Sequence, residues 1–110
     1  MVERAGSVGD MPSVVDNDTE RRIELTIGDT TAFIDYVLSG QKIMMTHTEV
    51  PEEFRGKGVG SALVRGALDL ARERELEVIP LCPFVVNYLR RHSEYLTLVS
   101  DKVRRQMQLG

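Results

Sequence analysis

Apolar and polar residues alternate along residues 22–50, as in strands that bury one face. The first run, RIELTIG, places Ile23, Leu25 and Ile27 on one side, with polar residues between them. Two further runs follow, TAFIDYVL and QKIMMTHTEV. The Gly-Asp and Ser-Gly dipeptides that separate the runs are typical of tight turns. The pattern predicts a three-stranded antiparallel meander.

After residue 58 the hydrophobic period becomes that of a helix. Val59, Leu63, Ala67 and Leu70 recur at helical spacing, with charged residues toward the other face. ELEVIPLC then predicts a short strand, and PFVVNYLRRH a second helix that opens at Pro83. Strand, helix and strand in this order form a βαβ unit with parallel strands. The final SDKVRRQMQLG fits either a strand or a helical turn.

These elements predict an α+β fold, in which an antiparallel meander precedes a βαβ unit and a C-terminal helix. The two neighbouring strands of the βαβ unit are interrupted by Pro51 and Pro80. Proline lacks the N–H that a continuous ladder needs. We therefore expect the two strands to splay apart near these prolines and to leave a cleft with free backbone donors and acceptors.

The net charge of -3 is unevenly distributed over the 110 residues. Residues 1–20 contain five acidic residues and one basic residue, which sum to -4 and leave +1 for the rest. We interpret residues 1–20 as a disordered acidic tail and residues 21–110 as one domain. A near-neutral domain argues against nucleic-acid binding, which requires many phosphate contacts.

Other features narrow the class of protein. No apolar run is long enough to cross a bilayer, and no secretory signal pattern precedes the strands. The lone Cys82 rules out an intrachain disulfide and fits a reducing cytoplasm. One cysteine and two histidines are also poor material for a structural zinc site. We expect a cytoplasmic monomer without a metal.

The glycine-rich stretch RGKGVGS lies between a strand and a helix. Such a loop can present free N–H groups and the positive end of a helix dipole to a phosphate. Alternatively, it is only a turn with basic residues on the surface. A Walker A loop fails here because Gly58, not Ser or Thr, follows Lys57. A dinucleotide fingerprint fits weakly, because Ser61 replaces its third glycine.

Arg55-x-x-Gly58-x-Gly60 resembles the pyrophosphate-binding motif of the GNAT acetyltransferase superfamily. The blocks HTEVPEEFRGKGVGSALV and VIPLCPFVVNYLRRHSEY together look like a family of small stand-alone GNAT-like proteins. The resemblance covers about residues 22–98 and departs at Ser93, where proline is expected. It implies a GNAT-like fold without the early helices that usually help to shape the acceptor site.

The resemblance implies acetyl-CoA as the cosubstrate. Backbone N–H groups from Lys57 to Ser61 would hold the pyrophosphate, and the pantetheine arm would run along residues 48–50. The expected cofactor-binding residues are Val50, Arg55, Gly56, Lys57, Gly58, Val59, Gly60, Ser61, Asn87 and Arg91.

Four residues are candidates for catalysis. Glu49 resembles the general base of several GNAT enzymes, and His47 shares its strand face. Tyr88 resembles the acid that protonates the CoA thiolate. Cys82 either lines the site or accepts the acetyl group as a nucleophile. Each also has a purely structural interpretation: a solvated carboxylate, a hydrogen-bonded imidazole, a packed aromatic ring and a small buried hydrophobe.

Two functions follow from these residues. The first is N-acetyl transfer from acetyl-CoA to a primary amine, on a small molecule or a lysine side chain, by direct attack in a ternary complex. The second is a non-catalytic module that binds or senses acyl-CoA. Convergence of the four candidate residues on one cleft would favour the first function, and a dispersed arrangement the second.

Overall fold

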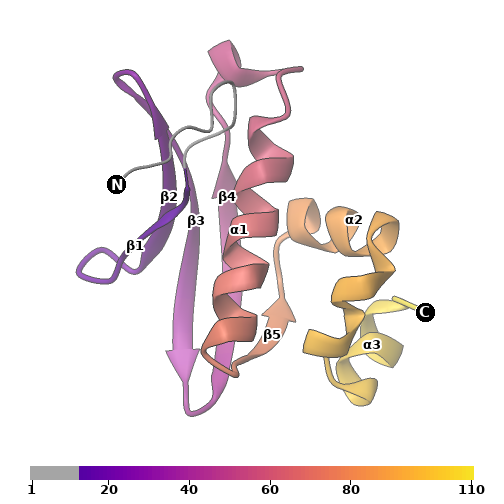
Figure 1. Ribbon diagram of the computed structural model, residues 1–110. Coiled ribbons are helices and arrows are strands. Elements are labelled where there is room, and N and C mark those ends of the chain that lie inside the picture. The colour runs from indigo at the N-terminus through magenta and orange to yellow at the C-terminus, as the bar shows by residue number, and fades with distance from the viewer. Residues whose placement is uncertain (1–12) are drawn as a thin grey trace.

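The computed structural model describes residues 13–110 as a five-stranded mixed sheet with helices on one side (Figure 1). The strand order is β1-β2-β3-β4-β5; the first three pairings are antiparallel and β4 with β5 is parallel. The predicted meander, βαβ unit and α+β class are confirmed. The strands are β1 (Val15–Asn17), β2 (Arg22–Ile27), β3 (Thr30–Ser39), β4 (Lys42–Glu49) and β5 (Glu77–Pro80). The helices are α1 (Val59–Glu73), α2 (Pro83–Arg91) and α3 (Asp101–Met107), with 3-10 segments η1 (Glu52–Phe54) and η2 (Ser93–Leu98).

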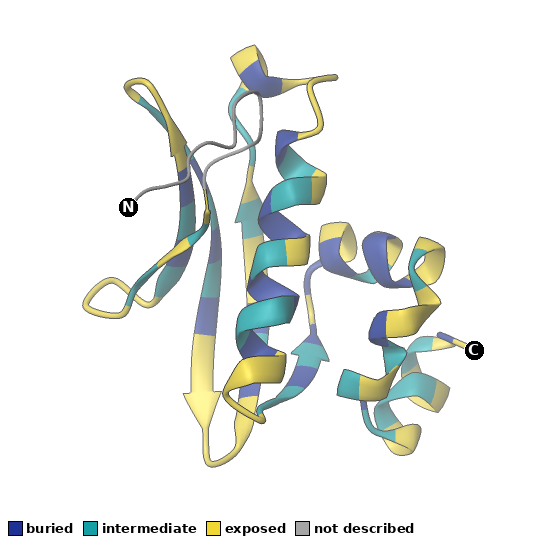
Figure 2. Ribbon diagram, in the orientation of Figure 1, coloured by how far each residue is buried: buried dark blue, intermediate teal, exposed yellow. Residues whose placement is uncertain are grey.

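The core lies between the sheet and α1, which packs across β2, β3 and β5. Buried positions recur along α1 and alternate along the central strands (Figure 2). Leu63, Val64 and Leu68 of α1 are fully buried, as are Leu25 and Ile34 of the sheet. Because burial of such side chains drives folding, the helical period of α1 and the alternation of β2 and β3 hold the helix in place.

A β-bulge in β4 was not visible in the sequence. Asp35 of β3 pairs with His47 and Tyr36 pairs with Met45, which leaves Thr46 as the extra residue. A bulge reverses the alternation of the residues that follow it. Ile43 and Met45 are buried under the helices, so beyond the bulge the even-numbered Thr48 takes the helix side.

The predicted splay of β4 and β5 is present, but its position differs from the prediction. The two strands pair only as far as Met45 and Pro80, after which the N–H groups of Leu81 and Cys82 both donate to the Met45 carbonyl. Pro80 marks the divergence, as expected. Pro51 does not, because it follows the end of β4 and lies outside the paired region. Residues 46–49 therefore have no strand partner on the β5 side among residues 13–110.

The predicted disordered tail extends too far, because it includes part of the sheet. Strand β1 pairs with β2, and its Asp16 accepts hydrogen bonds from the Tyr36 hydroxyl at 2.5 Å and from Arg74 at 2.6 Å. Burial, followed by this hydrogen bond, raises the pKa of Tyr36 to about 12. Residues 1–12 lie outside the described part of the chain. At the other end, the segment that fitted either a strand or a helical turn is helix α3.

Candidate active site

The glycine loop leads into the N-terminus of α1, which has no side-chain cap within residues 13–110. Gly56 and Gly58 both have φ of +77°, in the left-handed region that favours glycine, and Gly58 is the N-cap of α1. The first turn of α1 carries no acidic residue, and within residues 13–110 no side chain accepts from its first N–H groups. The partial positive charge of this helix end is therefore available to an anion.

One of the predicted phosphate-binding residues needs correction. The Lys57 N–H is not free, because it donates to the Phe54 carbonyl at 3.1 Å and closes the turn before α1. The prediction for Val59 concerned only its backbone N–H and is unaffected by its side chain, which is buried in the core with 1% exposure. The predicted donors that remain for a pyrophosphate are the N–H groups from Gly58 to Ser61.

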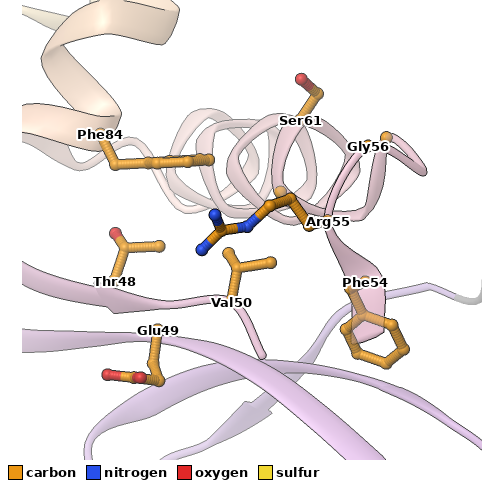
Figure 3. A pocket seen from close by; sticks show the side chains of 10 residues that line it. Thr48, Glu49, Val50, Phe54, Arg55, Gly56, Ser61 and Phe84 are labelled. Carbon is orange, nitrogen blue, oxygen red and sulfur yellow. The ribbon is translucent and has the colours of Figure 1, made fainter. Parts of the chain in front are cut away.

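The loop opens on a cleft of about 540 Å³ between the end of β4, the start of α1 and the start of α2. Figure 3 shows Thr48 of β4 and Val50, the residue after β4, pointing into the cleft, with the Arg55 guanidinium reaching in from the loop. Six of the ten predicted cofactor-binding residues thus meet in one place. The lining residues are Thr48, Glu49, Val50, Phe54, Arg55, Gly56, Gly58, Gly60, Ser61 and Phe84.

Gly60 serves a different purpose from the other two loop glycines. A Cβ atom at Gly60 would lie 2.5 Å from Cζ of Phe84, so the ring packs directly on the helix backbone. Phe84 nonetheless keeps 41% of its surface exposed and forms part of the cleft wall. The sequence interpretation missed Phe84 as a site residue; an aromatic residue at an exposed helix start was the available signal.

Glu49 and His47 share a strand face, as predicted, and lie 3.0 Å apart between Glu49 Oε1 and His47 Nε2. The bulge at Thr46 directs both side chains to the sheet face opposite Thr48. In Figure 3 the Glu49 carboxylate points away from the cleft that its residue lines. Both side chains are more than half exposed, so the pair is accessible to a molecule that approaches from the outer face of the sheet.

Cys82 lies at the N-cap of α2, directly before Pro83, as predicted. Its side chain is 5% exposed, and its Sγ donates to the Thr48 hydroxyl at 3.2 Å. This contact bridges β4 and the end of β5 where the two strands diverge. Cys82 therefore lies beside Thr48 close to the point where β4 and β5 diverge, which we call the inner end of the splay.

Tyr88 lies in a second hollow of about 110 Å³ between α1 and α2. Its ring stacks on His92, with ring centroids 4.0 Å apart, and burial raises the pKa of its phenol. The four catalytic candidates are therefore not gathered in one cleft. This second hollow holds two of the four cofactor-binding candidates that do not line the cleft, Asn87 and Arg91. Its lining residues are Ser61, Phe84, Asn87, Tyr88, Arg91 and His92.

Within residues 13–110, no helix combines the length and the apolar character needed to cross a membrane. In the same part of the chain, no group of three or more His, Cys, Asp or Glu side chains is arranged to hold a metal ion.

Comparison with known proteins defines the class to which this fold and cleft belong. Residues 22–98 match the family described as GCN5-related N-acetyl-transferase, and the chain belongs to that family. The chain is 31% identical to protein NATD1 of Gallus gallus and of Mus musculus over 85 residues, covering 74% of this chain and 77% of each relative. The solution structure of a GCN5-like protein from Staphylococcus aureus superposes with a TM-score of 0.63 and 25% identity, over 80% of this chain and 87% of that chain.

These comparisons confirm the resemblance inferred from the glycine loop and the PLCPFVVNY block, and with it the GNAT-like fold. Members of this family typically use acetyl-CoA and an acceptor substrate.

Proposed function

We propose that this protein is an acetyl-CoA-dependent N-acetyltransferase that transfers the acetyl group to a primary amine by direct attack in a ternary complex. The observation that carries the proposal is that two binding features border the same cleft. The uncapped N-terminus of α1 borders it, and so do Thr48 and Glu49 of β4, whose side toward β5 has no strand partner within residues 13–110. Together they offer anion binding and a free strand edge, which suit the pyrophosphate and the amide-bearing pantetheine arm of CoA.

Different residues of the cleft bind different parts of acetyl-CoA. The N–H groups from Gly58 to Ser61 bind the pyrophosphate, and Arg55 adds a positive charge from the loop before α1. The backbone of residues 46–49 orients the pantetheine arm toward the inner end of the splay. There Thr48 and Cys82 form a hydrogen-bonded pair beside which the thioester would lie. We assign Cys82 to lining this end rather than to nucleophilic attack.

Glu49 is the one carboxylate among the residues that line the cleft. In the proposed reaction it accepts the proton of the attacking amine through water, because its carboxylate points away from the cleft, and His47 supports its charge by the 3.0 Å hydrogen bond. A bond forms between the amine nitrogen and the acetyl carbon as the bond from that carbon to sulfur breaks. The sulfur leaves as the thiolate of CoA and takes up a proton from water.

A non-catalytic acyl-CoA-binding module is the second candidate function. The separation of the catalytic candidates favours it: Glu49 and His47 face the outer side of the sheet, Cys82 the inner end of the splay and Tyr88 the second hollow. This alternative keeps the same cleft and the same ligand. The two functions therefore differ in turnover and not in binding.

Calorimetry with acetyl-CoA, CoA and ATP tests the shared part of both functions. We expect binding of acetyl-CoA and CoA; binding of ATP alone would overturn both. Release of free CoA thiol in the presence of a panel of primary amines then separates them. Turnover supports the acetyltransferase, whereas tight binding with no turnover on any amine supports the module.

The role of Glu49 has its own test. We expect Glu49→Gln to lower kcat by about 100-fold, the low end for loss of a general base, with the Kd for acetyl-CoA little changed. Glu52→Gln is the matched control, because Glu52 is exposed in η1 and does not line the cleft. A Glu49→Gln enzyme as fast as the Glu52→Gln enzyme would remove Glu49 from the mechanism.

A further inference from the structure

The second hollow, between α1 and α2, has no role in the reaction proposed above. Phe84, Asn87, Tyr88 and Arg91 recur at helical spacing, so one face of α2 forms its wall. Ser61, from the first turn of α1, forms part of the opposite wall. Ser61 and Phe84 line both the hollow and the cleft, so the two spaces adjoin at the N-terminus of α1.

The lining of this hollow is suited to an anion. Its lining residues include Arg91, Ser61, Asn87 and His92, which carry polar or positively charged side chains, and no Asp or Glu. Arg65 lies close enough to lower the pKa of Tyr88, although burial has the larger, opposite effect. The phenol therefore stays protonated and able to donate at neutral pH.

Two acidic residues, Asp69 and Glu94, act on Tyr88 from outside the hollow. Asp69 accepts a hydrogen bond of 2.8 Å from the Tyr95 hydroxyl, and the Glu94 carboxylate lies 3.9 Å from Nδ1 of His92. Neither residue is part of the lining. Positive and neutral donors therefore dominate the surface that a bound group would meet.

The size of the hollow limits what it can hold. At about 110 Å³ it is one fifth of the cleft, which measures about 540 Å³. Since one water molecule takes about 30 Å³ of liquid, the hollow accommodates a group of a few heavy atoms, such as one phosphate, and not a nucleoside. A phosphate in the hollow would lie next to any group bound at the N-terminus of α1, because Ser61 and Phe84 line both spaces.

We propose that the hollow between α1 and α2 binds the 3′-phosphate of CoA and so selects CoA over dephospho-CoA. This inference rests on the proposed function, which places the pyrophosphate at the N-terminus of α1. The 3′-phosphate and the pyrophosphate are attached to the same ribose, at C3′ and C5′. A pyrophosphate at the Ser61 N–H therefore brings the 3′-phosphate to the adjoining hollow, where Arg91 forms a charge-assisted hydrogen bond with it.

The assignment also gives Tyr88 a role that agrees with its position. Tyr88 lines the hollow and not the cleft, so its phenol lies with the ribose end of CoA. The thiol is at the opposite end of the CoA molecule. Tyr88 is therefore a donor to the 3′-phosphate in this arrangement and not the acid for the departing thiolate.

Two adjacent arginines provide a matched pair for the test. Arg91 lines the hollow, whereas the Arg90 guanidinium donates to the Met107 carbonyl on the α3 side. Calorimetry on the full chain measures the Kd of CoA and of dephospho-CoA for wild type, Arg91→Ala and Arg90→Ala. We expect wild type to bind CoA at least about tenfold more tightly, as loss of a hydrogen bond to a charged group predicts. Arg91→Ala should bring the ratio near one, mainly through weaker CoA binding, and Arg90→Ala should keep the wild-type ratio.

Inorganic phosphate identifies the source of the anion. It should compete with CoA more strongly than with dephospho-CoA in wild type, and this difference should vanish in Arg91→Ala. If phosphate binds through Arg91 while wild type binds CoA and dephospho-CoA equally, the hollow is a site for free anions and the inference is overturned.

Further outcomes separate this inference from the proposed function. Equal loss of affinity for both nucleotides in Arg91→Ala would overturn the inference but leave CoA binding established. The same holds if Arg90→Ala abolishes the discrimination as completely as Arg91→Ala. If wild type binds neither nucleotide, the proposed function itself fails, and the inference fails with it.

Discussion

Gly60→Ala tests the closest packing contact at the edge of the cleft. The added Cβ would lie 2.5 Å from Cζ of Phe84, whereas carbon atoms in favourable contact are about 3.5–4 Å apart. The ring must therefore move by about 1 Å. Phe84 is 41% exposed and can turn outward, so the substitution should displace the ring without unfolding the protein.

The expected change in stability is small because two effects oppose each other. Alanine is favoured over glycine by up to about 1 kcal/mol within a helix, and Gly60 has an ordinary helical conformation. Forcing Phe84 off its preferred rotamer costs about 0.5–1.5 kcal/mol. We expect the net free energy of unfolding to change by less than about 1 kcal/mol. In a Phe84→Ala background the opposing cost disappears, and Gly60→Ala should stabilise.

Urea unfolding of the wild type, the two single variants and the double variant measures this coupling. We expect a coupling energy of about 0.5–1.5 kcal/mol, equal to the steric cost. Affinity for acetyl-CoA should fall in Gly60→Ala, because the methyl group and the displaced ring narrow the cleft. If Gly60→Ala changes stability by the same amount in both backgrounds, the contact with Phe84 is not what requires glycine.

Gly66→Ala is the control for a similar clash outside the cleft. Its Cβ would lie 2.5 Å from Cγ1 of Val14, where the chain before β1 crosses α1. We expect it to alter stability without altering the affinity for acetyl-CoA. A loss of affinity as large as that of Gly60→Ala would mean that binding reports general destabilisation.

Four further predictions concern single groups. The pKa values of Tyr36 and Tyr95 are raised to about 12, mainly by burial, so the unfolded chain loses these protons at lower pH than the folded chain. The free energy of unfolding should therefore stay constant below pH 10 and fall between pH 10 and 12 by up to about 2.7 kcal/mol per tyrosine. A urea midpoint that does not change over this range would contradict the prediction. Gly58→Ala should destabilise by about 1–2 kcal/mol in urea unfolding, because alanine disfavours φ of +77°; unchanged stability would refute the left-handed cap. Tyr88→Phe should raise the Kd for CoA, because one donor to the 3′-phosphate is lost. A fall in kcat with an unchanged Kd would instead show that Tyr88 protonates the departing thiolate. Rapid quench with labelled acetyl-CoA should leave Cys82 unlabelled, and a labelled Cys82 would establish a covalent intermediate.

Local pattern was sufficient for most of the fold. The alternation around Ile23 and Leu25 and the helical period from Val59 onward describe faces that must be buried, and burial of those faces assembles the sheet and α1. The tail boundary was wrong because β1 is only three residues long. Hydrogen bonds from Tyr36 and Arg74 to Asp16 hold β1 against the rest of the fold, and these contacts span 20 and 58 residues of sequence.

The glycine loop shows both what sequence can and cannot assign. A glycine with positive φ and one with a crowded backbone are identical in the sequence. Gly58 is required by its backbone conformation and Gly60 by the ring of Phe84, which is 24 residues away. The first requirement is local and could be anticipated; the second depends on how α2 packs against α1.

The sequence by itself determined the family, the order of the elements and the loop that borders the cleft, because these depend on residue type and spacing along the chain. Only the tertiary structure decided where the candidate side chains point. One bulged residue, Thr46, moves Thr48 to the helix side and Glu49 to the outer face. The packing of α2 places Tyr88 in a separate hollow. A bulge and a helix contact depend on pairing between distant segments, which no local pattern of residues contains.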